Sequence, residues 1–178
     1  SNTGATGPTG PNKLSSICDS DGDTFVDTDL NDTDDDIIRI QTLNGLIIAT
    51  DGTLGLTGPS RRFMYLPQEG ALRAGSVNGI QWDDINVGLN SVAFGLNTEA
   101  SGSQSISFGE NTLASGFSST AFGSATEASR NYSTAFGFNT TASGENSTSF
   151  GNSNKSIGEN STSFGNSNTS SGENSTSF

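Results

Sequence analysis

A fourteen-residue repeat fills the second half of the chain, from residue 90 to residue 178. Aligned without gaps, its units run from NSVAFGLNTEASGS and QSISFGENTLASGF to NSTSFGNSNTSSGE, and a partial NSTSF follows. A strict short period is typical of a solenoid, in which each repeat forms one coil stacked on the previous one. Fourteen residues are few for a helical repeat, and Ser, Thr, Asn and Gly are poor helix formers. The period therefore predicts an all-β solenoid.

One Phe-Gly pair marks the same place in every full unit. The phenylalanines are Phe94, Phe108, Phe122, Phe136, Phe150, Phe164 and Phe178. The glycines that follow them are Gly95, Gly109, Gly123, Gly137, Gly151 and Gly165, and a second set recurs at Gly102, Gly116, Gly144, Gly158 and Gly172, with Arg130 as the exception. We expect two five-residue strands in each unit and the two glycines at its corners. The coils then form a parallel β-roll with a step of about 4.8 Å.

Alternation along the strand predicts which side chains face outward. In STAFG, Ser133 and Ala135 point to one side, and Thr134 and Phe136 point to the other. A narrow coil holds only Ala, Ser and Thr, so the Phe column must face outward, where soluble monomers avoid a large apolar patch. Three copies around one axis would bury the column, at roughly 1.5–3 kcal/mol per ring. We therefore expect a homotrimer with the Phe column as its core and residues 140–144 in the outer wall.

Two other segments precede the repeat. Residues 1–13 contain the triplets GAT, GPT and GPN, which predict the end of a collagen-like stalk; a Pro/Gly-rich linker is the alternative. Residues 14–89 contain DTFVDT, DIIRIQT and LIIAT, which are typical of short strands between turn signals. The only Met and the only Trp of the chain also lie in this segment. We expect residues 14–89 to be a small β connector or cap with a compact core, and residues 90–178 to hold six full repeats and a partial one.

The repeat resembles the head domain of trimeric autotransporter adhesins of the YadA type, whose unit is close to NSxAxGxxAxAxGx. Units such as residues 90–103 and 132–145 fit that pattern well. The resemblance implies a left-handed parallel β-roll, a homotrimer, and an adhesive or spacer role on a cell or virion surface. Phe replaces the usual Ile or Val, and the later units carry Ser and Asn in place of Ala. The region before the repeat is similar to segments of bacterial, phage and large-virus fibre proteins, so a host glycan, a host protein or neighbouring fibres are candidate partners.

An acidic stretch before the repeat suggests a calcium site. DSDGDTFVD places Asp19, Asp21, Asp23 and Asp27 around a Gly, and such oxygen ligands suit Ca²⁺. The alternative is a set of acidic turns that keep strand edges soluble. Calcium is the one possible cofactor, and none is required.

Two further features have weaker interpretations. Glu145, Glu159 and Glu173 share one repeat position, which predicts a ladder of carboxylates, most simply a solvated corner. Cys18 lies close to the triplets and could link chains, although a buried free thiol is the simpler reading.

Composition narrows the function. The net charge is −12 and no basic patch is visible, which argues against nucleic-acid binding, and no apolar run is long enough to span a membrane. The chain has no His and no serine with a base nearby, so we expect no enzyme. A tailspike-like protein that binds or cleaves glycans is the alternative, and ice binding is less favoured because Thr is mixed with Ser and Asn. The sequence predicts an extracellular trimeric fibre that continues beyond residue 178.

Overall fold

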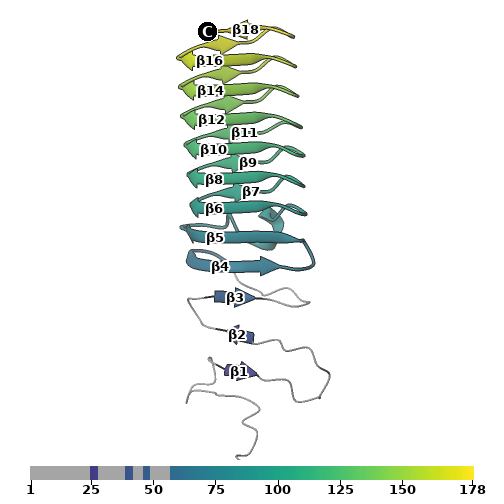
Figure 1. Ribbon diagram of the computed structural model, residues 1–178, viewed down its shortest axis with the longest axis vertical. Helices are drawn as coiled ribbons and strands as arrows, with labels where there is room; N and C mark the ends of the chain where they lie inside the picture. The colour runs from purple at the N-terminus through teal and green to yellow at the C-terminus, as the bar shows by residue number, and fades with distance from the viewer. Residues whose placement is uncertain (1–24, 28–38, 42–45, 49–56) are drawn as a thin grey trace, which may run out of the picture.

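The structure is a computed structural model that describes the backbone of residues 25–27, 39–41, 46–48 and 57–178, and side chains from residue 57 onward. Within these residues the chain is all-β, apart from the 3-10 helix η1 at Asp84–Asn86. From β4 onward the strands form a single stack that ends at β18 (Figure 1). Among the described residues, no helix reaches the length and apolarity needed to cross a lipid bilayer.

Each repeat contributes one long strand and one short strand. The long strands are β6 Val92–Leu96, β8 Ile106–Glu110, β10 Thr120–Ser124, β12 Thr134–Phe138, β14 Thr148–Asn152 and β16 Thr162–Asn166, followed by β18 Thr176–Ser177. The short strands are β7 Glu99–Ala100, β9 Leu113–Ala114, β11 Glu127–Ala128, β13 Thr141–Ala142, β15 Lys155–Ser156 and β17 Thr169–Ser170. We number the full coils 1 to 6 from residues 90, 104, 118, 132, 146 and 160. The prediction of two five-residue strands is therefore right for the first strand and wrong for the second, which has two residues.

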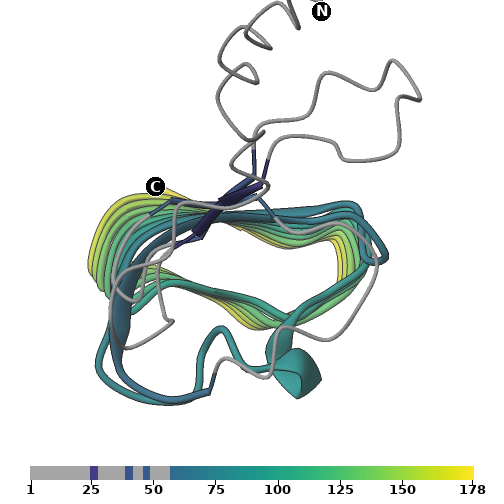
Figure 2. The same ribbon diagram turned by 90° about the horizontal axis from the view of Figure 1, so that it is seen from below.

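The strands pair in a parallel register that repeats every fourteen residues. Phe122 lies opposite Phe108 on one side and Phe136 on the other, and Gly123 lies between Gly109 and Gly137. The long strands belong to one ten-stranded sheet, and the short strands form a second sheet of six. Seen along the stack, the coils superimpose into one flattened loop (Figure 2). This confirms a parallel β-solenoid with coils of fourteen residues.

The interior of the coils contains small side chains only. Alanines at two positions of the repeat are fully buried, among them Ala93, Ala121, Ala128 and Ala135. Ser133 is buried beside Ala135, whereas Phe136 is exposed, which confirms the predicted alternation. The coil is too narrow for anything larger than Thr or Asn along this axis, so aromatic rings must lie outside it.

The corners differ in part from the prediction. The second set of glycines, such as Gly102, lies in the turn that follows the short strand, as expected. The first set lies inside the long strands, and Gly123 has a φ of 130° there. A Cβ on Gly123 would come within 1.9 Å of the Gly137 carbonyl oxygen, so this set serves close stacking of successive coils.

The left-handed corner residues are mostly not glycines. In each coil the first and eighth residues have φ between 52° and 62°, for example Asn97 and Asn111. Asn tolerates this conformation better than most residues because its short side chain bonds locally. Here Asn97 Nδ2 also donates to Asn111 Oδ1 at 3.0 Å, so the side chains link successive coils. The prediction that both corners are made by glycine was wrong for this reason.

The segment before the repeat packs against the first coil. Strands β4 (Ser60–Leu66) and β5 (Ala71–Val77) form an antiparallel hairpin, and β5 pairs in parallel with β6. Strand β3 (Leu46–Ile48) extends this sheet, while β1 (Phe25–Asp27) and β2 (Arg39–Gln41) pair with each other. Each of these three short strands lies in one of the runs that the sequence predicted to be a strand between two turns. The 3-10 helix protrudes on the side of the coil opposite the ten-stranded sheet (Figure 2).

A buried core closes the lower end of the roll. Met64, Val77 and Trp82 pack with Ala93 and Ala100 of coil 1. The Trp82 indole N–H donates to the Thr98 carbonyl oxygen at 2.8 Å, so the ring is fixed under that coil. The expectation that the segment with the only Met and Trp holds a compact core is confirmed.

Candidate subunit interface

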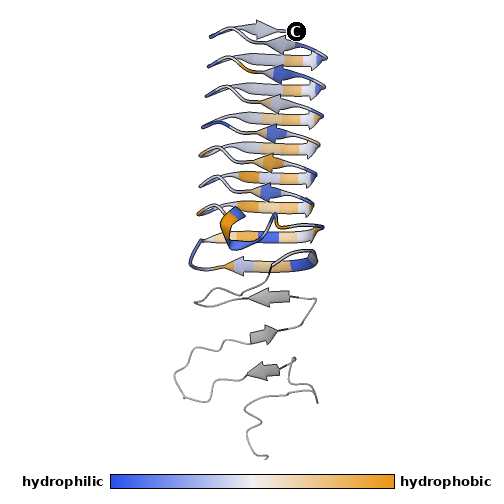
Figure 3. Cartoon of the chain, turned by 180° about the vertical axis from the view of Figure 1, so that it is seen from behind, coloured by the Kyte–Doolittle hydropathy of each residue, from blue (hydrophilic) through white to orange (hydrophobic). Residues whose placement is uncertain are grey.

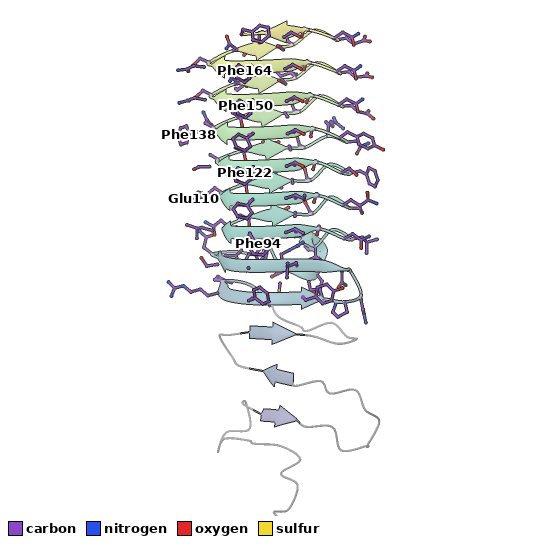
Figure 4. All side chains as sticks on the ribbon, in the orientation of Figure 1. Phe94, Glu110, Phe122, Phe138, Phe150 and Phe164 are labelled. Carbon is purple, nitrogen blue, oxygen red and sulfur yellow. The ribbon has the colours of Figure 1, made fainter. Side chains whose placement is uncertain are left out.

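The seven phenylalanines form one straight column on the outer face of the ten-stranded sheet (Figure 4). From Phe94 to Phe164 the neighbouring rings are stacked with their centroids 4.8–5.8 Å apart and their planes within 11°. This spacing is close to that of adjacent strands, because each ring is carried by the same position of successive strands. Phe178 is tilted by 57° from Phe164. A parallel register without a slip is therefore sufficient to produce the column.

The rings are half exposed in a single chain. The exposed fraction is between 39% and 48% from Phe108 to Phe164 and reaches 86% at Phe178. If a Phe side chain offers about 200 Å², each inner ring leaves roughly 80 Å² uncovered. Burying that area contributes about 2 kcal/mol per ring at about 25 cal/mol per Å². Five such rings thus provide a driving force for association that surface side chains rarely offer.

The apolar face extends below the repeat onto the hairpin. Phe63 lies in register with Ala74 of β5 and, through it, with Phe94. Phe63 and Tyr65 are both more than 40% exposed on the face that carries the Phe column. Sequence analysis missed these two residues, although the alternation in SRRFMYL, with Met64 and Leu66 buried, places them outward. Apolar segments recur one above another along successive strands (Figure 3).

The outer face of the six-stranded sheet has a different chemistry. Its outward position holds Glu99, Leu113, Glu127, Thr141, Lys155 and Thr169. Only one of these six side chains is apolar, and no column of rings forms. The two faces of the roll therefore separate into an aromatic face and a polar wall.

Arg73 is a buried cation that sequence analysis did not identify. Its side chain is fully buried, and its Nη atoms donate to the carbonyl oxygens of Leu72, Ser91 and Ala100 at 3.0–3.1 Å and to the Ser91 hydroxyl at 2.8 Å. Burial lowers the pKa of this guanidinium to about 10, while the carboxylates of Glu69 and Glu99 oppose the shift. At neutral pH the guanidinium is charged. Its N–H groups satisfy the hydrogen-bond acceptors at the lower end of the coil interior. A charged residue in a strand is ordinarily expected to be exposed, so nothing in the sequence indicated that Arg73 would be buried.

The other predicted sites have different outcomes. Asp19, Asp21, Asp23, Cys18 and the collagen-like triplets of residues 1–13 lie outside the described residues, and only the backbone of Asp27 is described, in β1. Across the part of the chain that is described, no group of three His, Cys, Asp or Glu side chains could hold a metal ion. The calcium site thus stays a prediction.

The carboxylate ladder lies at an exposed turn. Glu145, Glu159 and Glu173 are all exposed, and the Glu173 carboxylate accepts a hydrogen bond from Asn174 Nδ2 at 3.3 Å. This is the solvated corner that the sequence favoured.

Arg130, the exception to the second glycine set, changes the local hydrogen bonding. At the equivalent Gly144 the backbone N–H donates to the next coil, to the Ser156 carbonyl oxygen at 3.2 Å. The Arg130 N–H donates instead to the Ser133 hydroxyl at 3.2 Å, and that hydroxyl donates back to the Arg130 carbonyl at 2.6 Å. Ser147 donates to the Gly144 carbonyl oxygen at 2.6 Å in the same way, so the change at Arg130 is confined to the partner of its N–H, and the stack continues without interruption.

The repeat agrees with a known family. Residues 87–112, 114–140, 132–154, 142–162 and 156–178 match the YadA head domain repeat, and together they cover just over half of the chain. A comparison with curated proteins finds no match. Heads of this type form homotrimers in general, and the proteins that carry them are surface-exposed adhesins. Since period, register and alternation all agree with that match, the chain belongs to the YadA head domain repeat family.

Proposed function

We propose that this chain is a segment of a homotrimeric extracellular fibre, in which the β-roll attaches the fibre to a surface or acts as a spacer shaft. Three copies would turn their ten-stranded sheets toward a shared axis and expose their polar walls to water. The adhesin family of the repeat supports this role. Left-handed winding of the coils is part of the proposal, as the family implies.

The half-exposed Phe column carries the proposal. The coil interior is filled with buried Ala and Ser side chains, so the rings cannot move inside their own chain. Neither can the short strands cover them, since those belong to the other sheet. A second and a third copy are the simplest cover, because each brings an identical column with the same spacing.

The two last full repeats support a shaft rather than a single binding site. Residues 146–159 and 160–173 match at twelve of fourteen positions. Their strands pair in the same register as the rest of the stack. Adding such a unit lengthens the rod by one step and leaves its cross-section unchanged. A site that depends on one arrangement of side chains would not be duplicated without loss.

The stalk and the calcium site rest on the sequence alone, whereas the described strands before the repeat also support the connector. Residues 1–13 are proposed as the end of a collagen-like stalk that leads into the trimer, and residues 14–89 as the connector. Calcium at Asp19, Asp21, Asp23 and Asp27 is proposed as an optional ligand. Thermal unfolding with and without a chelator tests it: we expect a lower transition temperature in chelator, and an unchanged transition contradicts the calcium site.

Size-exclusion chromatography with light scattering tests the trimer. We expect three times the mass of one chain, and a stable monomer overturns the proposal. The variant Phe136→Asp places a carboxylate in the column and should dissociate the trimer. Thr141→Asp is the matched control, because it adds the same charge to the same coil on the polar wall. It should stay trimeric; equal dissociation of both variants would contradict the assignment of the aromatic face as the interface.

A further inference from the structure

Apolar side chains also lie at the two ends of certain long strands, beside the Phe column. In coil 4, Tyr132 precedes β12 and is 53% exposed, and Phe138 ends β12 and is 56% exposed. Phe138 lies at the edge of the sheet where the strands end (Figure 4). Leu89, immediately before coil 1, precedes β6, Leu96 of coil 1 ends it, and both are more than 40% exposed. We call the two edges the start edge and the end edge of the sheet.

The residues at the two edges have matching chemistry in every full coil except coil 3. Where the end edge is apolar, at Leu96 and Phe138, the start edge of the same coil is apolar too. Coils 2, 5 and 6 are polar at both edges, apart from Ile106, which begins β8 in coil 2 and is 44% exposed. Their end-edge residues are Glu110, Asn152 and Asn166, and their start-edge residues are Ser103 and Gln104, Glu145 and Asn146, and Glu159 and Asn160.

Coil 3 differs at one residue, and the structure accounts for it. Its end edge has Ser124, but Phe117 precedes its start edge. The Phe117 ring meets the Tyr132 ring edge-to-face with centroids 5.5 Å apart, and the Tyr132 N–H donates to the Phe117 carbonyl at 2.8 Å. Phe117 thus joins the apolar start edge of coil 4. The pair leaves both rings more than a third exposed, so it does not bury itself.

These matched edges cannot meet within one chain. Tyr132 and Phe138 are six residues apart across an extended strand, which is about 20 Å. In a ring of three copies, by contrast, the start edge of one sheet contacts the end edge of the next, because such contacts join two different surfaces. The edges face each other at the same height only if the copies are in axial register.

We propose that Phe138 of one copy packs against Tyr132 and Phe117 of the next, and that Leu96 packs against Leu89 in the same way. These two contacts are three coils apart. They close the ring of three copies and fix the axial register between neighbouring copies. A shift by one coil toward the C-terminus would place Leu96 against Ser103 and Gln104, and Phe138 against Glu145 and Asn146. A shift by one coil the other way would leave Phe138 in contact with Phe117 but would separate it from Tyr132, which would then face the polar Asn152. The Phe column alone cannot fix the register, since it is the same at every coil. This inference rests on the proposed homotrimer and adds how the copies recognise one another.

Cysteine cross-linking tests the inference. In a Cys18→Ser background, the double variant Tyr132→Cys/Phe138→Cys carries both edges of coil 4. A short bis-maleimide cannot join them within one chain, so we expect covalent dimer and trimer bands on a denaturing gel. The control Tyr132→Cys/Glu110→Cys pairs the same start edge with the end edge two coils lower, about 10 Å away along the stack. It should give few such bands, and each single-cysteine variant should give none.

The outcomes separate the inference from the proposed function. Light scattering first establishes whether each variant is a trimer. A trimer in which positions 132 and 138 do not cross-link, or in which positions 132 and 110 cross-link equally well, contradicts the proposed register contacts. The proposed trimer itself is then unaffected. A monomer of the chain without these substitutions overturns both. A charge exchange is the second measurement: Phe138→Glu should lower the transition temperature of the trimer, and adding Tyr132→Lys should restore part of the loss. The absence of any restoration contradicts the contact.

Discussion

The first four coils and the last two share one backbone but have different interiors. In the first four, the fourth and eleventh residues of the coil are alanine, with Ser107 as the exception, and Ala114, Ala121, Ala128, Ala135 and Ala142 pack as one buried apolar cluster. In the last two, serine occupies these two positions, and asparagine replaces the threonine at the ninth position. The register does not change at the boundary between them. An apolar core therefore does not determine the backbone path and the strand register of the roll.

The polar interior is held by hydrogen bonds that the alanine interior lacks. Asn154 is fully buried; its Nδ2 donates to the Phe150 and Gly165 carbonyl oxygens at 2.7 Å, and its Oδ1 accepts from the Asn168 N–H at 2.7 Å. Ser156 donates to the Thr148 carbonyl oxygen at 2.6 Å. Buried polar groups are tolerated when they are paired in this way. The comparison shows two ways to fill the same space: alanine packing in the first four coils and, in the last two, a polar network around Asn154 and Ser156 that leaves the Ser149 and Ser161 hydroxyls without a partner among the described residues.

The largest effect should come from the glycines that both regions share. A Cβ at Gly123, in the alanine region, would meet the Gly137 carbonyl oxygen at 1.9 Å, and one at Gly151, in the polar region, would meet the Gly165 oxygen at 2.1 Å. Both contacts are to backbone, which cannot move aside. We expect Gly123→Ala and Gly151→Ala each to cost more than about 4 kcal/mol of unfolding free energy.

Thermal and denaturant unfolding monitored by circular dichroism measure this cost. Ser124→Ala and Asn152→Ala are matched controls, because each lies next to its glycine on the outer face. The controls should change stability by less than about 0.5 kcal/mol. If one glycine variant were as stable as its control, the two regions would not share a single backbone frame.

Substitutions at the ninth position of the coil should change stability by different amounts in the two interiors. Asn154→Ala removes three hydrogen bonds and leaves the Asn168 N–H without its partner, so we expect a loss of about 2–4 kcal/mol. Thr140 holds the same position in the alanine region, is fully buried, and its hydroxyl has no partner among the described residues. Thr140→Val should therefore change stability by less than about 1 kcal/mol or increase it slightly. Equal losses in the two variants would show that the interiors are not held differently.

Much of this fold could be predicted because it depends on two periods. One is the fourteen-residue period of the coil, and the other is the two-residue alternation of side chains along a strand. Together they place Phe136 outside and Ala135 inside without any knowledge of the rest of the chain. The left-handed corners could not be predicted in the same way, since Ser118, Ala125 and Tyr132 adopt a conformation that their side chains do not favour. There the stacking of neighbouring coils overrides local preference. Arg73 was missed because three of its four hydrogen bonds go to Ser91 and Ala100, which are distant from it in the sequence.

The smallest expected effect comes from a substitution that introduces one feature of the polar interior, a buried serine, into an alanine coil. In coil 2, Ser107 stands where most of the first four coils have alanine, and its hydroxyl lies 2.7 Å from the Thr112 hydroxyl and 3.0 Å from the Thr112 carbonyl oxygen. In coil 3 the corresponding residues are Ala121 and Thr126, and the Thr126 hydroxyl has no partner among the described residues. Because coil 2 already accommodates this serine, we expect Ala121→Ser to fit without strain and to raise stability by about 0.5 kcal/mol.

A double-mutant cycle shows whether that gain comes from the hydroxyl pair. In a Thr126→Val background, the serine keeps the carbonyl oxygen as an acceptor but loses the hydroxyl partner. Ala121→Ser should therefore be less favourable there by about 1 kcal/mol, measured by denaturant unfolding of all four proteins. If the substitution had the same effect in both backgrounds, the pairing would not explain the gain. The mixture of alanine and serine along the roll would then reflect packing volume alone, and the contrast between the two interiors would be one of size rather than of hydrogen bonding.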